Sequence, residues 1–174
     1  MLINAYHTLI LISVKYQLGS GTMHTVENIE ELKSLVGQEL GTSEWIEISQ
    51  ERINKFADAT GDHQWIHVDT ERAKTELPGG TTIAHGFLTL SLLPRIVQDI
   101  YKVKGVRHSL NYGSDRIRFT APVPAGSRVR GRYTLKTVED VKNNGLKIVG
   151  ETTFEIEGED RPACIAESIG ILYT

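Results

Sequence analysis

The sequence predicts an α+β domain in which an antiparallel sheet curls around one long buried helix. Three observations lead to this prediction. Residues 86–102 are apolar around most of a helical circumference, which is typical of a buried helix. After Gly105 apolar and polar residues alternate, which is the period of a strand. The pair Asn144-Gly145 is a strong hairpin signal, and a hairpin makes its two strands antiparallel.

Length and composition favour a single domain with a hydrophobic core. The chain has 174 residues, of which 40% are hydrophobic and 24% are charged. The net charge of -3 gives no sign of the basic face that nucleic-acid binding favours. Cys164 is the single cysteine and cannot form an internal disulfide, so we expect a reducing compartment, the cytoplasm.

The first 22 residues are expected to lie outside the domain. Leu9–Ile12 is apolar but too short to span a bilayer. The first basic residue, Lys15, follows this run, whereas a secretory signal carries positive charge before its apolar segment. We therefore predict that residues 1–22 are an N-terminal extension, disordered or non-native, and that residues 23–174 are the domain.

Two helices and a strand are expected before the long apolar run. Residues 26–36 have apolar positions at helical spacing, and residues 44–48 suit a first strand. Ser49 is a good N-cap for a second helix. Gly61 ends that helix, because glycine readily takes the left-handed conformation required after a helix C-terminus. Asp62 then follows the helix end, where the dipole disfavours a carboxylate.

Residues 70–82 are expected to form a surface connection, because Pro78-Gly79-Gly80 interrupts regular structure. The longest helix should then run over residues 86–102 and end at Gly105. Pro94 lies inside this helix and should kink it, since proline removes a backbone donor.

The second half of the chain should supply most of the sheet. Strands are expected at residues 116–119, 129–137, 146–156 and 163–173, separated by turns at residues 122–126, 144–145 and 161–162. In the second of these strands a stripe from Arg128 to Arg132 alternates with apolar residues. Such a stripe is more often a solvated face than a phosphate site.

Asp62 and His67 are the candidates for acid–base chemistry. An imidazole exchanges a proton near neutral pH, and a nearby carboxylate can orient it, stabilise its charged form or hold a water molecule. Taken alone, the spacing Asp-x4-His more often belongs to an aspartate that caps a turn and a structural histidine.

Gly86 is a candidate of a different kind. It opens the long helix, where the first backbone N–H groups have no helical partner and favour negative charge. A glycine there lets a ligand approach the backbone, although tight packing would also require one. His85 either faces a ligand or is a local hydrogen-bond partner.

A metal site is not expected. Acidic and imidazole side chains are crowded between residues 62 and 85, but the chain has no pair of histidines at helical spacing with a clear third ligand and no cysteine cluster. Arg116 and Arg118 lie nearer the expected pocket and are candidates for binding phosphates.

The residues Ala57-Asp58-Ala59-Thr60-Gly61-Asp62-His63-Gln64-Trp65-Ile66-His67-Val68-Asp69, followed by Ile83-Ala84-His85-Gly86, resemble the MaoC-like dehydratases, which include the (R)-specific enoyl-CoA hydratases. The resemblance covers the chain from about Val26 onward. With Asn111-Tyr112-Gly113, it is nearest to the branch that contains nodulation protein N.

The resemblance implies a hot-dog fold, in which an antiparallel sheet wraps a long central helix, and a homodimer whose sheets join. It also implies hydration of a trans-2-enoyl-CoA to an (R)-3-hydroxyacyl-CoA, or the reverse dehydration. Asp62 and His67 would hold and activate one water molecule, and the Gly86 N–H would bind the thioester oxygen. The expected partner is an acyl-CoA or acyl-carrier-protein thioester, with no nucleic acid, no membrane and no cofactor beyond the substrate's own CoA.

The chain departs from the common family pattern at Gln64 and Trp65, where many members have Asn and Pro. Gln64 can make the same amide hydrogen bonds, and with His85, Arg116 and Arg118 it completes the predicted substrate-binding residues. Trp65 cannot restrict the backbone as proline does.

A hot-dog thioesterase and a non-catalytic acyl-thioester-binding subunit remain the alternatives to a hydratase.

Overall fold

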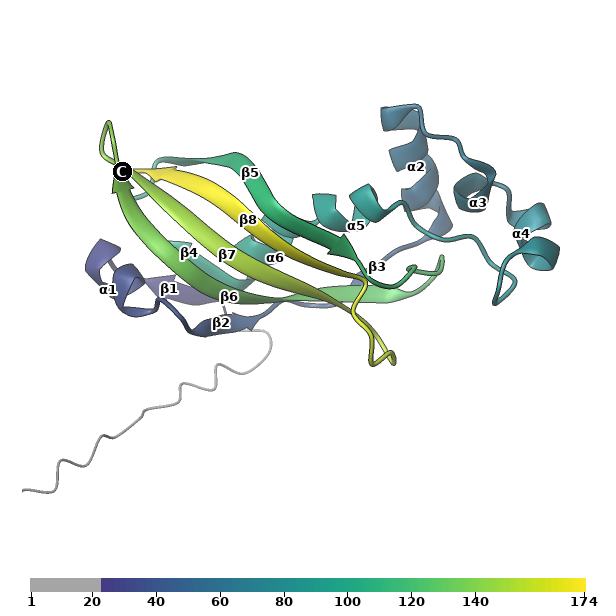
Figure 1. Ribbon diagram of the computed structural model, residues 1–174, viewed down its shortest axis with the longest axis horizontal. Coiled ribbons are helices and arrows are strands. Elements are labelled where there is room, and N and C mark those ends of the chain that lie inside the picture. The colour runs from purple at the N-terminus through teal and green to yellow at the C-terminus, as the bar shows by residue number, and fades with distance from the viewer. Residues whose placement is uncertain (1–22) are drawn as a thin grey trace, which may run out of the picture.

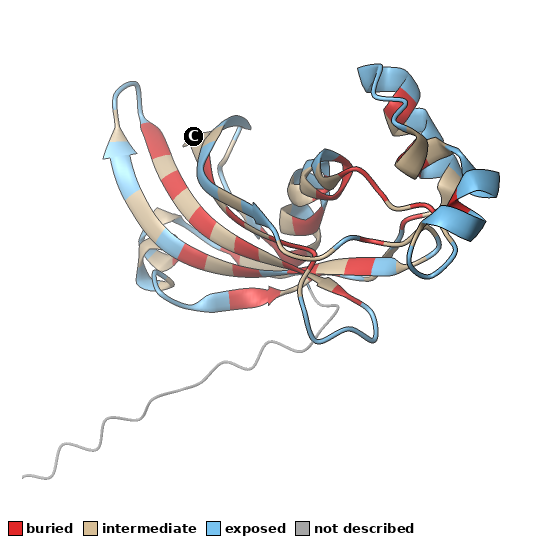
Figure 2. Ribbon diagram, turned by 45° about the vertical axis from the view of Figure 1, so that its right-hand side comes forward, coloured by how far each residue is buried: buried red, intermediate tan, exposed pale blue. Residues whose placement is uncertain are grey.

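The computed structural model describes residues 23–174, and the predicted extension of residues 1–22 lies outside the described residues (Figure 1). Within residues 23–174, six strands form one antiparallel sheet, with the order β2-β6-β7-β8-β5 and with β3 paired to β6. The bounds of these strands are β2 Glu39–Thr42, β3 Ile46–Glu47, β5 His108–Phe119, β6 Arg128–Val141, β7 Gly145–Ile156 and β8 Cys164–Tyr173. The sheet curls around α5 and α6, so the predicted hot-dog architecture is confirmed (Figures 1 and 2).

The central helix is interrupted, unlike the predicted continuous helix over residues 86–102. Helix α5 (Gly86–Ser91) stops at Leu92 and α6 (Leu93–Ile100) begins directly after it. Pro94 explains the break, because it has no N–H to donate to the preceding turn and fits the first turn of a new helix. Residues 101–102 were also predicted as helix, but they belong to strand β4 (Tyr101–Val103), which pairs in parallel with β1 (His24–Val26).

The core lies between this helix pair and the concave face of the sheet. Four helical side chains at intervals of four residues are buried, namely Leu88, Leu92, Ile96 and Ile100. Strand positions alternate between buried and accessible along β6 and β7, as Figure 2 shows. Gly131 of β6 faces Ile96, and a Cβ there would overlap that side chain. The helix therefore approaches the sheet more closely than any larger residue would allow.

The N-terminal part differs from the prediction at its first helix and at its first strands. Helix α1 is shorter than predicted, Ile29–Ser34, and is capped by Asn28. Val26 lies in β1 because it pairs with Val103, a long-range contact that a local pattern does not show. The predicted strand 44–48 is reduced to β3, and β2 was not predicted.

A lobe of three helices projects from one end of the sheet (Figure 1). It contains α2 (Gln50–Thr60), α3 (Trp65–Val68) and α4 (Thr70–Glu76). The predicted caps of α2 are confirmed, since the Ser49 side chain accepts from the Arg52 N–H and Gly61 is left-handed with φ 76°. The prediction of a plain connection over residues 70–82 is wrong for α4.

The β6–β7 hairpin is confirmed, but its turn lies one residue earlier than predicted. Asn143 and Asn144 take the left-handed conformation, with φ 62° and 55°, and Gly145 already belongs to β7. Asparagine tolerates this conformation better than most residues. None of the helices in the described part of the chain is long and apolar enough to cross a membrane.

Candidate active site

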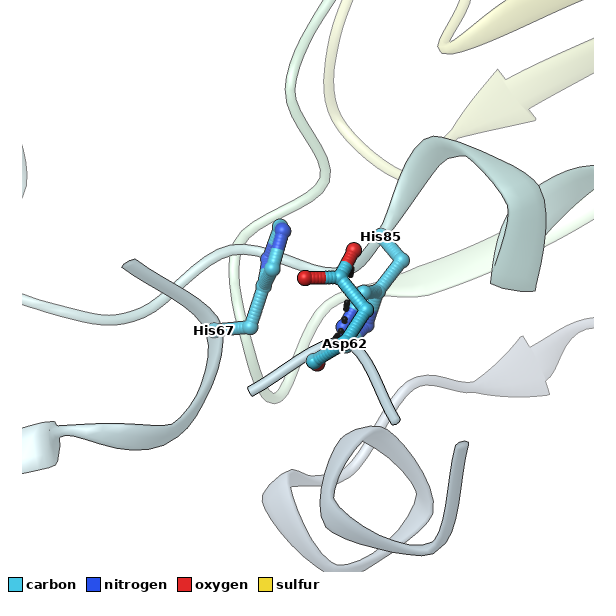
Figure 3. Close-up of side chains that lie close together, drawn as sticks. All are labelled: Asp62, His67 and His85. Atoms are coloured by element: carbon cyan, nitrogen blue, oxygen red, sulfur yellow. Dashed lines mark hydrogen bonds and ion pairs between the residues drawn. The ribbon is translucent and has the colours of Figure 1, made fainter. Parts of the chain in front are cut away.

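Asp62 lies in the short loop that connects α2 to α3. The left-handed Gly61 turns the chain there, and the Asp62 carboxylate accepts a hydrogen bond from the Gln64 N–H at 3.3 Å. The Asp62 side chain is 55% exposed. Figure 3 shows its carboxylate pointing toward the His67 ring.

His67 is buried on α3, with 7% of its surface exposed. Its Nδ1 lies 2.7 Å from the Ile83 carbonyl oxygen. Because a carbonyl can only accept, Nδ1 carries the proton and Nε2 of the neutral ring keeps a lone pair. Burial lowers the pKa of His67, and the neighbouring His85 also lowers it, while the Ile83 carbonyl and Asp62 act in the opposite direction. His67 is therefore held toward its neutral form, with one free basic nitrogen.

His85 connects the loop that carries Asp62 with the beginning of helix α5. Its ring is 3% exposed and stacks on His67, with 3.7 Å between ring centroids. Its Nε2 donates to the backbone oxygen of Asp62 at 2.9 Å. The same nitrogen is 3.9 Å from the Asp62 carboxylate. His85 thus ties the Asp62 loop to the start of α5, and this position favours a local hydrogen-bond partner over a ligand-facing residue.

Gly86 is the first residue of α5 and, with His67, lines a cavity of about 290 Å³. The other walls come mainly from residues 119–123, including Phe119 at the end of β5. A Cβ on Gly86 would lie 3.0 Å from the Phe119 ring. Glycine is therefore needed for packing against Phe119, and it also leaves the backbone at the wall of the cavity.

Asp62, His67 and His85 each offer one ligand atom, and these atoms lie within 4.8 Å of one another. Carboxylate and imidazole groups can bind a transition metal ion. However, the two imidazole rings are stacked at an interplanar angle of 27°, so their in-plane lone pairs do not converge on one point. Each ring also uses one nitrogen for a backbone carbonyl. We therefore keep the prediction that no metal is required.

The other predicted substrate-binding residues are not gathered at the cavity. Gln64 is exposed, and it is its backbone N–H that bonds to Asp62. Arg116 and Arg118 are exposed on β5 and alternate with Ile117 and Phe119. Since Phe119 lines the cavity, the two arginines point to the other face of the strand.

Gln50 supports the site and was not identified from the sequence. Its side-chain amide donates to the His67 carbonyl at 2.8 Å and its amide oxygen accepts from the Thr82 hydroxyl. It thereby holds α3 against α2 and against the segment that leads to His85. Its partners are 17 and 32 residues away, so no local pattern signals this role.

In this antiparallel hot-dog fold, His67 and the helix start at Gly86 line one cavity, and the Asp62 carboxylate and the His85 ring lie next to His67. This arrangement defines a class of hot-dog protein whose site is suited to acid–base chemistry. The sequence comparisons agree with this class. The family model described as a MaoC like domain matches residues 31–156. The chain therefore belongs to the MaoC-like family and is a hydratase or dehydratase of that type.

Two groups of relatives cover most of the chain. The 3-hydroxyacyl-thioester dehydratase Z of Mycobacterium tuberculosis is 54% identical over 147 residues, which are 84% of this chain and 97% of the relative. Nodulation protein N of Rhizobium leguminosarum is 50% identical over 151 residues, 86% of this chain and 93% of the relative. The predicted family and its nodulation-protein-N-like branch are confirmed.

Solved structures show the same fold at low identity. A monoamine oxidase regulatory protein from Archaeoglobus superposes with a TM-score of 0.69 at 20% identity, covering 88% of this chain and 99% of that one. The (R)-hydratase of A. caviae gives a TM-score of 0.61 at 22% identity, covering 78% of this chain and 94% of that one.

Proposed function

We propose that this protein adds water to a trans-2-enoyl-CoA to give the (R)-3-hydroxyacyl-CoA, or catalyses the reverse dehydration. The observation that carries the proposal is His67, which is held toward its neutral form with one ring nitrogen free, lies close to the Asp62 carboxylate and lines a cavity together with Gly86. The names of the M. tuberculosis relative, a 3-hydroxyacyl-thioester dehydratase, and of the A. caviae (R)-hydratase support it.

In the proposed reaction, Asp62 and His67 hold one water molecule. His67 Nε2 accepts a proton from the water as its oxygen bonds to C3 of the enoyl chain. The electron pair of the double bond moves toward the thioester. The Asp62–His67 pair then delivers a proton to C2, on the same face of the enoyl chain as the added water. The Gly86 N–H donates to the thioester oxygen while it carries enolate charge; such a donor is worth about 10²–10³ in rate.

A thioesterase is the second candidate. It would require the same water to attack the thioester carbonyl, next to the Gly86 N–H, rather than C3. A binding subunit without turnover is the third candidate, and it would need neither the free Nε2 of His67 nor the carboxylate of Asp62.

Purified protein and crotonyl-CoA test the proposal. We expect the absorbance of the conjugated enoyl thioester to fall without release of free thiol, and Asp62→Asn to lower kcat by about 10²–10⁴-fold. Release of thiol would favour the thioesterase. No change with crotonyl-CoA or with longer enoyl chains would favour the binding subunit.

We also propose that the protein is a homodimer joined through β5. This strand is an edge of the sheet and carries exposed Leu110 and Tyr112 along 12 residues. Long exposed apolar edges are otherwise prone to aggregate. Arg116 and Arg118 lie on the same strand but face away from the cavity, so as proposed contacts for CoA phosphates they require the CoA to extend onto that face. A cytoplasmic location and the absence of a cofactor stay predictions.

A further inference from the structure

The cavity that His67 and Gly86 line contains a further polar group that none of the proposed chemical steps uses, the hydroxyl of Thr89 on α5. Among the described residues of this lining, the polar side chains are those of His67, Thr89 and Thr120. The Thr120 hydroxyl donates to the Pro162 carbonyl oxygen, so it is already engaged. Within residues 23–174, Thr89 therefore supplies the one uncommitted hydroxyl of this cavity.

The Thr89 hydroxyl lacks the partner that a threonine in a helix commonly has, the carbonyl one turn earlier. In residues 23–174 it has no hydrogen-bond partner, in contrast to the Thr60 hydroxyl, which donates to the Phe56 carbonyl at 2.7 Å. The corresponding acceptor for Thr89 is the His85 carbonyl, which takes the Thr89 N–H at 3.3 Å. The hydroxyl proton of Thr89 is therefore available to a ligand.

The position of the Thr89 oxygen is defined by burial. The residue is 2% exposed, so it has almost no surface outside the cavity that it lines. The fully shielded side-chain atoms without a partner belong to other residues, His24, His85, Thr137 and Thr152. The Thr89 oxygen therefore borders the open cavity. A buried hydroxyl without a partner is costly, which indicates that a water molecule or a ligand atom in the cavity bonds to it.

The helix places this hydroxyl near the Gly86 N–H. Residues three apart lie on one face of an α-helix, and Gly86 and Thr89 line the same cavity. A helical side chain leans toward the N-terminus and covers the turn before its own Cα. The Thr89 side chain is thus directed back to the turn that begins at Gly86, where the thioester oxygen is proposed to bind.

A thioester oxygen can accept from both donors. It has two lone pairs, and the Gly86 N–H would engage one of them. Negative charge develops on this oxygen in the proposed reaction, and a donor that is already fixed in a buried wall needs no reorganisation at that moment.

We propose that the Thr89 hydroxyl is a second hydrogen-bond donor to the thioester oxygen, beside the Gly86 N–H, and that it stabilises the enolate. The hydroxyl keeps its proton throughout and forms no covalent bond. This inference adds a catalytic residue to the proposed hydratase, and it rests on that proposed function for the orientation of the substrate.

Three variants test the inference. Thr89→Val removes the hydroxyl at nearly constant volume, and Thr89→Ser keeps it. Thr152→Val is the matched control, because Thr152 is also buried and its hydroxyl also lacks a partner, but it does not line the cavity. Neither valine variant breaks a hydrogen bond within the described chain, so denaturant unfolding should show no loss of stability in either.

We expect Thr89→Val to lower kcat with crotonyl-CoA by about 10²-fold with little change in KM, because the donor acts chiefly when the oxygen becomes charged. Thr89→Ser should keep most of kcat, and Thr152→Val all of it. An unchanged kcat in Thr89→Val, or an equal fall in Thr89→Ser, would overturn the inference.

Acetoacetyl-CoA measures the same contact without turnover. Loss of a proton from its C2 gives an enolate whose charge is shared by the thioester and keto oxygens, and ultraviolet absorbance follows this ionisation as the pH is raised. A donor to the thioester oxygen favours the charged form. We therefore expect Thr89→Val to raise the pKa of the bound ligand by about one pH unit, which is a tenfold change in its ionisation constant, and Thr152→Val to leave it unchanged.

The two measurements separate this inference from the proposed function. If no enoyl-CoA is hydrated but Thr89→Val raises the pKa of bound acetoacetyl-CoA, the hydratase proposal fails and the donor assignment stands. If hydration is observed and Thr89→Val changes neither kcat nor this pKa, only the donor assignment fails. A fall in kcat without a change in the pKa would place the hydroxyl at another atom of the reaction, and it would also overturn the assignment.

Discussion

His67 is the residue whose protonation should set the acidic limit of the activity. Its pKa is lowered chiefly by burial, and the proposed reaction requires the neutral ring. The hydration rate should therefore persist below the ordinary histidine pKa of about 6.5 and fall only at lower pH. A profile of kcat against pH with crotonyl-CoA measures this limit; an acidic midpoint above 6.5 would contradict it.

The same lowered pKa has a consequence for stability. Between the folded pKa of His67 and the unfolded value of about 6.5, the unfolded chain binds more protons at this residue. The contribution of His67 to the free energy of unfolding should therefore be complete above pH 6.5 and decrease as the pH falls through that interval. Denaturant unfolding of wild type and His67→Gln at several pH values isolates this contribution.

His85 should act by positioning the reactive groups rather than by touching the substrate. His85→Phe keeps a ring that can stack on His67 but loses the donor to the Asp62 carbonyl, whereas His85→Gln keeps a donor near the position of Nε2. We expect His85→Phe to lower kcat by about tenfold or more, with little change in KM, because misplaced groups slow the reaction.

The comparison with His85→Gln makes this test specific. Partial recovery of kcat in His85→Gln would identify the hydrogen bond as the useful contact. An equal fall in both variants, or a rise in KM alone, would argue that His85 contacts the substrate, the other role that the sequence permits.

At the scale of elements, the end of α2 determines where Asp62 lies. Gly61 has a left-handed backbone, and a Cβ added there would meet no atom within 4 Å. Gly37, which follows α1, is also left-handed and has the same open space at the Cβ position. Alanine at either position should cost about 1 kcal/mol of unfolding free energy, since only the backbone conformation is strained. Gly61→Ala should in addition lower kcat, because Asp62 is the next residue.

Gly37→Ala is the matched control for this prediction. Both free energies come from denaturant unfolding, and both rates from the crotonyl-CoA assay. Equal rates in the two variants would mean that the Asp62 loop keeps its position without the left-handed glycine.

The elements that the sequence predicted are those with strong local signals. The apolar run after His85, the alternation in β6 and β7, and the Ser49 and Gly61 caps each appear within a short window. Helix α4 was not predicted because Ala73 is its one buried residue, so it has no apolar stripe. Strand β4 was not predicted because it depends on pairing with β1, about 77 residues away in the sequence, as in the pair His24 and Tyr101.

At the scale of the whole molecule, the sequence named the candidate catalytic residues but not how they are held. Asp62, His67 and Gly86 were singled out by type and spacing together with the family resemblance, and the fold brings them to one region. The hydrogen bonds that hold these residues join segments that are distant in the sequence. His85 donates to the backbone carbonyl of Asp62, 23 residues earlier, and the Gln50 side chain donates to the His67 carbonyl. Local periodicity carries no information on such contacts, so Gln50 and the place of His85 emerged only from the structure.

At the same scale, we expect the protein to be a dimer whose interface is the edge strand β5. If two copies pair along this edge, the exposed Leu110 and Tyr112 become buried, and a lysine at each position would place two charges in the interface. We expect Leu110→Lys with Tyr112→Lys to convert a dimer to a monomer in sedimentation velocity. Val36→Lys, at another exposed apolar residue remote from β5 in the sequence, is the control and should stay dimeric. A wild-type protein that sediments as a monomer at micromolar concentration would remove the dimer proposal. A dimer that survives the β5 variant would place the interface on another face.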